Sequence, residues 1–334
     1  FAKASDALLL VDPVMGDSGE MYKGFSDSLC SKIKSLALMA DIVTPNVTEI
    51  YLLTGEQNIE KAAGILLESG IKTVIVTGGA SGIGKAVSQE FLNEGANVVV
   101  CDMNPEAPTF ETNAESGKLL YVVTNVTNME SVQAMVDKAV ETFGSIDILV
   151  NNAGINIPRL LVDPKDPKGQ FELDEAVWDK VVNVNFKGVF FCAQAAAREM
   201  VKKGEGVIVN MSSESGLEGS EGQSVYAATK NAVNSLTRSW AKELGKLGVR
   251  VVGVAPGILE ATGLRTIQYE TALAYTRGIT VDELRAGYSK TSTTPLGRSG
   301  KLTEVADLVC YVASKRASYV HGVTFNVAGG KTRG

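Results

Sequence analysis

The sequence predicts an α/β protein built on one doubly wound parallel sheet. A β-branched run, Lys72–Thr77, leads into the glycine-rich turn Thr77–Gly84, and an amphipathic stretch from Ile83 to Asn93 follows. Strand, turn and helix in this order are typical of a dinucleotide-binding unit. A second apolar run, Ala96–Cys101, ends at Asp102, close to the roughly 20 residues beyond the glycines expected for an acid that binds ribose hydroxyls. The rest of the chain alternates strand and helix patterns, which favours the same fold class.

The glycine turn is the predicted phosphate cradle. Gly78, Gly82 and Gly84 let the backbone turn tightly and approach a pyrophosphate, while Ser81 and Ile83 stand where the free N–H groups of the helix begin. Asp102 would repel a 2′-phosphate, and no Arg or Lys adjoins it. The sequence therefore favours NAD over NADP as the cofactor.

Later elements follow from hydrophobic periodicity. Strands are expected near residues 119–123, 146–151, 206–211, 249–254 and 323–327, and helices near 128–143, 174–203, 224–247 and 302–314. The long segment from Ile258 to Pro295 is expected to cover a substrate, because long segments beside a cofactor often form lids.

A tyrosine and a lysine one helical turn apart are the predicted proton-transfer pair. Tyr226 has an ordinary pKa near 10 and needs a neighbouring cation to act at neutral pH. Lys230 lies on the same helical face and can supply that charge. Ser213 can hold the reacting oxygen near the phenol. We therefore expect an oxidoreductase, in preference to a non-catalytic nucleotide sensor, which needs no proton relay.

Composition excludes other functions. The net charge of −6 without a basic cluster gives no electrostatic support for nucleic-acid or anionic-membrane binding. No apolar run is long enough to span a bilayer. The four cysteines are widely spaced, and His321 is the only histidine, so we expect neither a metal site nor a serine-histidine triad. The cytoplasm is the expected compartment.

These residues, in order and spacing, resemble the short-chain dehydrogenase/reductase family over about residues 72–334. The further matching motifs are Asn151-Asn152-Ala153-Gly154, Asn185, Tyr226-Ala227-Ala228-Thr229-Lys230 and Pro256-Gly257. The resemblance implies seven parallel strands with helices on both faces, a homotetramer or homodimer, and Asn185 holding a water beside Ser213, Tyr226 and Lys230. The cofactor contacts that it implies, beyond the turn and Asp102, are Asn125, Val126, Asn152, Ala153, Gly154, Tyr226, Lys230, Pro256, Gly257 and Ile258. Asn125 stands where the family usually has an aspartate, so the adenine contact loses a charge.

The predicted substrate depends more on resemblance. The stretches MSSESGLEGSEGQSVYAATK and VGVAPGILEATGLRT are similar to family members that oxidise D-sorbitol 6-phosphate to D-fructose 6-phosphate. Arg159 and Arg265 closely follow motifs expected to border the pocket, and an arginine fork suits phosphate. Glu214 is a candidate for binding sugar hydroxyls. Another polyol and a 3-oxoacyl thioester are the alternative substrates.

Residues 1–71 predict a different unit. VDPVMGDSG and TPNVTE resemble the late part of pyridoxal and hydroxymethylpyrimidine kinases of the ribokinase-like family, in which Asp12, Asp17, Asn46 and Glu49 would lie around the metal-phosphate region. A helical face follows between Ile59 and Leu67. The kinase anion hole is missing, because the next strand leads into the dehydrogenase glycine turn, so charge on a transferring phosphoryl group would not be neutralised. We expect a non-catalytic kinase-like fragment joined to a dehydrogenase, with vitamin kinase activity as the alternative.

Overall fold

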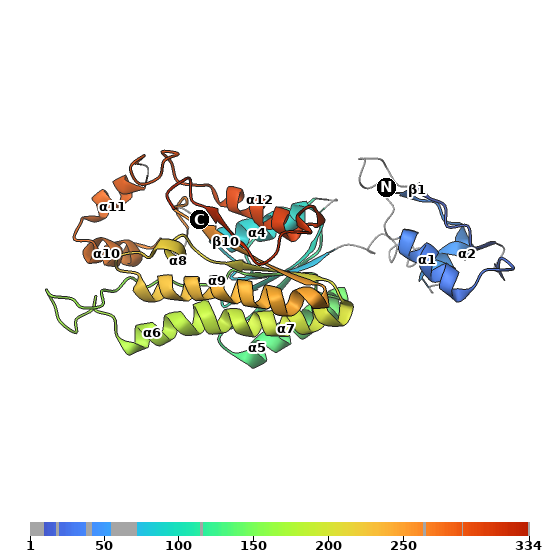
Figure 1. Ribbon diagram of the computed structural model, residues 1–334, viewed down its shortest axis with the longest axis horizontal. Helices are drawn as coiled ribbons and strands as arrows, with labels where there is room; N and C mark the ends of the chain where they lie inside the picture. The colour runs from blue at the N-terminus through green and yellow to red at the C-terminus, as the bar shows by residue number, and fades with distance from the viewer. Residues whose placement is uncertain are drawn as a thin grey trace. The chain divides into compact units, whose positions relative to one another are not determined.

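The computed structural model describes residues 10–17, 20–37, 42–54, 72–113, 116–262, 265–288 and 290–332. Two compact units are present, Phe1–Ile71 and Lys72–Gly334 (Figure 1). The helical face expected between Ile59 and Leu67 lies outside the described residues.

A seven-stranded parallel sheet organises the larger unit, in the order β11-β10-β9-β8-β5-β6-β7. Its strands are β5 (Thr73–Thr77), β6 (Asn97–Asp102), β7 (Leu119–Val123), β8 (Ile148–Asn151), β9 (Gly206–Met211), β10 (Val249–Pro256) and β11 (Thr324–Val327). The strand order reverses between β5 and β8, and in open α/β sheets ligands bind beyond the carboxyl ends of the strands at such a point. The predicted doubly wound fold is confirmed.

Helices cover both faces of this sheet (Figure 1). One face packs against α4 (Gly82–Asn93) and α12 (Leu302–Ala313), and the other against α5 (Met129–Phe143), α7 (Gly188–Lys203) and α9 (Ser224–Leu244). Side chains alternate between the two cores, as the period of a strand requires. In β5, Val74 and Val76 enter the first core and Ile75 the second, and all three are fully buried. Continuous apolar runs are therefore what both faces need.

The helix expected over residues 174–203 is interrupted. It consists of α6 (Glu175–Val182), a π-helical segment (Asn183–Lys187) and α7. The hydrophobic periodicity of the sequence is that of a helix over the whole range. Inside the π segment, the side chain of Asn185 is fully buried and is hydrogen-bonded to the loop after β8. A π-bulge often marks a functional position in a helix. The helix expected over 224–247 ends at Leu244 and closes with the 3-10 turn Gly245–Leu247.

Two helices lie in the long segment after β10. They are α10 (Ile267–Thr276) and α11 (Val281–Gly287). Thr266 caps α10, and Thr280 with Glu283 forms a capping box on α11, a pattern that the sequence TVDE carries. We expected a long covering segment here but predicted neither helix. The capping box in the sequence is a signal for the start of α11.

The chain between β8 and α6 contains a polar insert, which includes Asp163 and Phe171 and packs against α10. Tyr275 donates to the buried carboxylate of Asp163 (2.8 Å), and its ring stacks on Phe171 with the ring centroids 4.2 Å apart. The insert therefore fixes the position of the covering helices.

The described residues of the smaller unit form two short strand pairs and two helices. Strand β1 (Leu10–Val11) pairs in parallel with β4 (Ile42–Val43), and β2 (Gly16–Asp17) pairs with β3 (Glu20–Met21) in antiparallel fashion. The helices are α1 (Asp27–Ala37) and α2 (Val47–Thr54). Its described core consists of Val11, Met15, Ala37 and Leu53.

Candidate active site

The glycine turn between β5 and α4 has the backbone that only glycine adopts easily. Gly78 and Gly82 have φ of 61° and 53°, in the left-handed region that is costly for residues with a Cβ atom. A methyl group added at Gly84 would overlap the carbonyl oxygen of Gly78 and the side chain of Asn152. The turn is therefore packed directly against the loop that follows β8.

Helix α4 presents its first N–H groups to a cavity. Ser81 is the N-cap residue, and its side chain makes no capping hydrogen bond to any described residue. Gly78, Ser81, Gly82 and Ile83 all line the cavity, whose volume is about 520 Å³. Free N–H groups and the positive end of the helix dipole form an anion site. Thr262, which stands later than the usual threonine of the family, lines the cavity beside Gly82.

Asp102 lies at the carboxyl end of β6, next to the glycine turn. One carboxylate oxygen accepts a hydrogen bond from the N–H of Ala80 (3.1 Å) and the other from the N–H of Asn104 (3.2 Å). Asp102 and its neighbour Met103 both line the cavity. A carboxylate at this place can accept hydrogen bonds from ribose hydroxyls.

The loop after β8 forms another wall. The N–H groups of Asn152 and Ala153 donate to the hydroxyl of Thr77 at 3.0 Å each, and the Asn152 amide donates to the carbonyls of Thr77 and Gly78. Asn152, Ala153 and Gly154 line the cavity. These bonds join the carboxyl ends of β5 and β8, where the strand order reverses.

The structure separates Asn125 from its neighbour Val126. Val126 lines the cavity, whereas Asn125 does not. The carbonyl oxygen of the Asn125 side chain accepts bonds from the N–H (3.0 Å) and hydroxyl (2.8 Å) of Thr127. Asn125 thus orders the turn before α5, and the contact expected between its side chain and adenine has no support in this arrangement.

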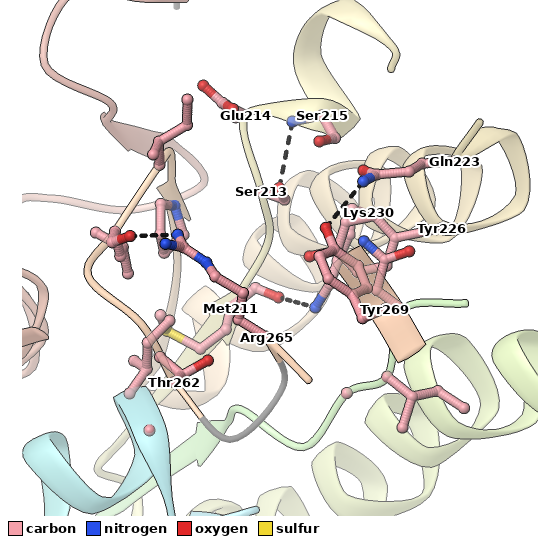
Figure 2. Close-up of a pocket in the computed structure, with 18 of the residues that line it drawn as sticks. Met211, Ser213, Glu214, Ser215, Gln223, Tyr226, Lys230, Thr262, Arg265 and Tyr269 are labelled. Carbon is pink, nitrogen blue, oxygen red and sulfur yellow. Dashed lines mark hydrogen bonds between the residues drawn. The ribbon is translucent and has the colours of Figure 1, made fainter. Parts of the chain in front are cut away.

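Ser213, Tyr226 and Lys230 meet at the same cavity (Figure 2). Ser213 follows β9, and the other two lie one turn apart on α9. The Lys230 ammonium donates to the carbonyl oxygen of Met211 (2.8 Å) and lies 5.8 Å from the centroid of the Tyr226 ring. The lysine is therefore held beside the phenol by the end of β9.

Burial opposes charge on both groups. It raises the pKa of Tyr226, which a hydrogen bond with Ser213 partly lowers and the negative charge of Glu214 raises further. Burial lowers the pKa of Lys230 from 10.5 to about 8. A phenolate and an ammonium in this site would each relieve the desolvation cost of the other.

Both the oxygen and the nitrogen of the Asn185 side-chain amide are hydrogen-bonded within the protein. Its oxygen accepts from the N–H of Ile155 (2.8 Å), and its nitrogen donates to the carbonyl of Ile155 (2.8 Å) and to the hydroxyl of Thr229 (3.4 Å). It does not line the cavity. In this arrangement Asn185 positions the loop after β8 relative to α9.

The loops after β9, β10 and β11 close the cavity near Ser213. Pro256, Gly257 and Ile258 line it. Glu214 is buried, lines the cavity, and accepts from the ammonium of Lys331 (2.5 Å) and the hydroxyl of Thr332 (3.2 Å). The carboxylate of Glu214 is thus engaged by the C-terminal segment.

The two arginines expected to bind substrate lie in different places. Arg265 lines the cavity, whereas Arg159 does not. Arg159 donates to the carbonyl of Pro158 (2.7 Å), and its guanidinium lies 5.9 Å from the centroid of the Phe171 ring. Sequence proximity to a site motif therefore did not place Arg159 in the cavity, because the insert turns toward α10.

Several cavity residues were not among those predicted. Gln223, Tyr269, Arg277, Tyr288 and Lys331 line it. Gln223 donates to the Tyr269 hydroxyl (3.0 Å), beside Tyr226 (Figure 2). Three of them, Tyr269, Arg277 and Tyr288, lie on the covering helices or in the turns beside them. The sequence predicted a lid there but did not show which of its side chains line the cavity.

These residues fit a dinucleotide. The glycine turn offers backbone N–H groups where a Cβ atom would not fit, and a carboxylate stands one strand away. Within the described ranges no group of three or more His, Cys, Asp or Glu side chains is arranged to hold a metal ion. Of the helices in those ranges, none is long and apolar enough to cross a membrane.

In the smaller unit, two of the four residues that resemble a kinase site form a helix cap. Asn46 and Glu49 make a reciprocal capping box at the start of α2, with both bonds near 3 Å. The other oxygen of Glu49 accepts from the N–H of Met15 (3.0 Å), and the Asn46 amide donates to the carbonyl of Gly16 (2.9 Å). Both oxygens of the Glu49 carboxylate are therefore bound by backbone N–H groups.

Comparison with known protein families finds two matches. Residues 72–272 match the short chain dehydrogenase family, and residues 17–97 match the pfkB family of carbohydrate kinases. The second match begins in the smaller unit and continues through β5 and α4. The resemblance of the chain to both families is thus confirmed, and the two matches overlap on the strand where the families were expected to meet.

Individual proteins are similar to the larger unit over nearly their whole length. A sorbitol-6-phosphate 2-dehydrogenase of Klebsiella pneumoniae is 59% identical over 261 residues, which cover 78% of this chain and 96% of the relative. A 3-oxoacyl-[acyl-carrier-protein] reductase of Thermotoga maritima is 40% identical over 265 residues, covering 78% and 97%. The crystal structure of gox2181 superposes with a TM-score of 0.63 at 34% identity and covers 78% of this chain and 95% of that one.

Proposed function

The chain belongs to the short-chain dehydrogenase family and is an oxidoreductase, and from this premise we propose that it catalyses the reversible NAD-linked oxidation of D-sorbitol 6-phosphate at carbon 2 to D-fructose 6-phosphate. The observation that carries the proposal is the meeting of Ser213, Tyr226 and Lys230 at the cavity that also contains the glycine turn. The similarity to a sorbitol-6-phosphate 2-dehydrogenase over 96% of that protein supports the substrate.

Each member of the proton-transfer group has a separate task in this proposal. Ser213 binds the substrate oxygen, and Tyr226 takes the alcohol proton at its phenol oxygen. Lys230, held by the Met211 carbonyl, stabilises the phenolate form of Tyr226. A bound nicotinamide supplies the acceptor for the hydride. Asn185 keeps the Ile155 backbone in place relative to α9 through its paired bonds.

Asp102 supports NAD as the cofactor. Its carboxylate lies in the cavity beside the glycine turn, where a 2′-phosphate would meet a like charge. The described cations that line the cavity are Lys230, Arg265, Arg277 and Lys331. Lys230 donates to the Met211 carbonyl and Lys331 to the carboxylate of Glu214. Neither lysine is therefore available to bind a 2′-phosphate.

An unpaired acceptor supports a polyol as the substrate. The side-chain oxygen of Asn156 is buried and has no hydrogen-bond partner among the described residues, and Asn156 lines the cavity. A buried acceptor without a partner is costly. A hydroxyl of the bound polyol would satisfy it.

We extend the proposal to the rest of the protein. The smaller unit is non-catalytic, since both oxygens of the Glu49 carboxylate bind backbone N–H groups. The enzyme works in the cytoplasm as a homodimer or homotetramer. Trp178 on α6 and Phe190 on α7 are 48% and 40% exposed, and these helices are suited to pack against a second copy. Light scattering on the purified chain measures the oligomeric state, and a monomer would contradict that part.

The proposed reaction is tested by following NADH absorbance with NAD⁺ and D-sorbitol 6-phosphate. Free sorbitol and reduction of an acetoacetyl thioester are the comparison substrates. A Tyr226→Phe variant should lose about 10²- to 10⁴-fold in kcat, because it removes the proton acceptor. A folded, NAD-binding protein that does not turn over sorbitol 6-phosphate would contradict the substrate, and turnover of the thioester would replace it.

A further inference from the structure

Four cations of the described residues line the cavity, namely Lys230, Arg265, Arg277 and Lys331. Lys230 and Lys331 are committed, the first to the Met211 carbonyl and the second to the carboxylates of Glu214 (2.5 Å) and Glu218 (3.5 Å). Arg265 and Arg277 have no carboxylate partner in the part of the chain that the structure describes. Two guanidinium groups are therefore available for an anion.

A buried acid on the covering helices is already neutralised. Glu270 is buried on α10, and its carboxylate accepts two bonds from Arg285 of α11, at 3.0 and 2.6 Å. This ion pair joins the two helices. Glu270 is therefore not available to neutralise Arg265 or Arg277.

Arg265 and Arg277 both lie near Tyr288. The guanidinium of Arg265 lies 4.1 Å from the centroid of the Tyr288 ring, and Arg277 is close enough to Tyr288 to act on it electrostatically. Each arginine is held by one neutral acceptor, Arg265 by the Leu259 carbonyl (2.5 Å) and Arg277 by the Ser220 hydroxyl (3.2 Å). A guanidinium has five N–H donors, so these single bonds orient each fork and leave donors for a ligand.

The pair belongs to the same cavity as the proton-transfer group. Tyr269 lines this cavity too, and both Tyr226 and Arg277 act electrostatically on its hydroxyl. Its hydroxyl accepts a bond from Gln223 (3.0 Å), beside Tyr226 (Figure 2). A substrate whose alcohol carbon lies at Tyr226 would therefore extend along Tyr269 toward the arginines.

We propose that Arg265 and Arg277 form the subsite that binds the phosphate group of the substrate. This inference rests on the proposed oxidation of a sugar phosphate and assigns its anionic end. Two guanidinium groups that line one cavity suit a phosphate, which accepts paired bonds from arginine. The subsite lies on the covering segment, so phosphate binding would also hold that segment over the reacting carbon.

The test compares Arg265→Gln, Arg277→Gln and the double variant with wild type in two assays. Arg198→Gln is the matched control, because Arg198 is exposed on α7 and bonds only to Gln194 among the described residues. The first assay measures KM and kcat for sorbitol 6-phosphate, with KM for NAD⁺ as a check of folding. The second measures binding of inorganic phosphate calorimetrically in the presence of NADH.

We expect each single variant to raise KM for sorbitol 6-phosphate about tenfold or more, with KM for NAD⁺ unchanged, because a bond to a charged group is lost. The double variant should also lose phosphate binding, whereas Arg198→Gln should retain it. Turnover of sorbitol 6-phosphate with unchanged KM in the variants would overturn the subsite and leave the proposed function. Wild type without such turnover would overturn the function, and phosphate binding lost in the double variant would then still support the subsite. Wild type that binds no phosphate, or a double variant that binds it equally, would overturn the subsite.

Discussion

Lys230 should make the stability of this protein increase between about pH 8 and 10.5. Burial lowers the pKa of this lysine from 10.5 to about 8 in the folded protein. The unfolded chain therefore binds more protons than the folded chain between these two values, and the free energy of unfolding rises with pH there. Below about pH 8 both states carry the charge, and the folded state bears the full desolvation cost.

The size of the effect follows from the shift. One pKa unit corresponds to about 1.4 kcal/mol, so the cost at pH 7 is about 3 kcal/mol. Between pH 7 and pH 9.5 about 2 kcal/mol of it should disappear. Lys230 is 4% exposed, so solvent screening does not reduce this value strongly. The same cost favours a phenolate next to Lys230, because a negative charge there stabilises the buried ammonium.

The measurement is urea denaturation followed by tryptophan fluorescence at several pH values, using Trp178 and Trp240. Tyr226→Phe is compared with Tyr226→Phe/Lys230→Met, since removing the phenol from both proteins leaves the lysine as the titrating difference. We expect the first protein to gain about 2 kcal/mol relative to the second between pH 7 and 9.5. A difference that stays constant with pH would refute the reasoning. An offset between the curves at pH 7 combines the desolvation cost that the substitution removes with the loss of the bond to the Met211 carbonyl, for which about 1–3 kcal/mol is typical, so the change with pH is the test.

Three further substitutions test other parts of the structure. Gly84→Ala should abolish nucleotide binding, because the added methyl overlaps the backbone of the glycine turn; calorimetric titration with NADH measures it, and unchanged affinity would contradict the packing described. The far-ultraviolet circular dichroism of Gly84→Ala beside wild type is the control for folding. Asp102→Asn should lower KM for NADP⁺ relative to NAD⁺ by removing the like charge, and an unchanged ratio would argue against Asp102 as the discriminating group. Tyr275→Phe removes the bond to buried Asp163 and should raise KM for the sugar substrate but not for NAD⁺; equal changes in both would show that the insert does not act through α10.

The fold and the glycine turn were readable because local physics determines them. A buried strand packs against apolar cores on both faces of the sheet, so runs such as residues 74–76 are apolar without interruption and can be recognised in the sequence. Gly84 is glycine because backbone lies where a Cβ would be. The spacing of Tyr226 and Lys230 places both on one helical face, and the structure has both at the cavity.

The positions of other side chains depend on contacts between segments that lie far apart in the sequence. Arg159 and Arg265 each follow a site motif, but the insert carries Arg159 onto Phe171, whereas Arg265 lines the cavity. Arg277 lines the same cavity from the C-terminal end of α10. Asn185 reads as one position in a long helix, and its paired bonds to Ile155 depend on the π-helical segment.

The sequence by itself determined the doubly wound sheet, the oxidoreductase family, the glycine turn and the helical spacing that brings Tyr226 and Lys230 to one cavity, because period, backbone conformation and helical spacing act over short stretches of chain. Only the tertiary structure decided which cations line the cavity and which are neutralised. Glu214 binds Lys331 and Glu270 binds Arg285, and these partners lie far apart in sequence or on different helices. Their pairing leaves Arg265 and Arg277 for a ligand, since the charge available to a substrate depends on what folding brings within contact distance.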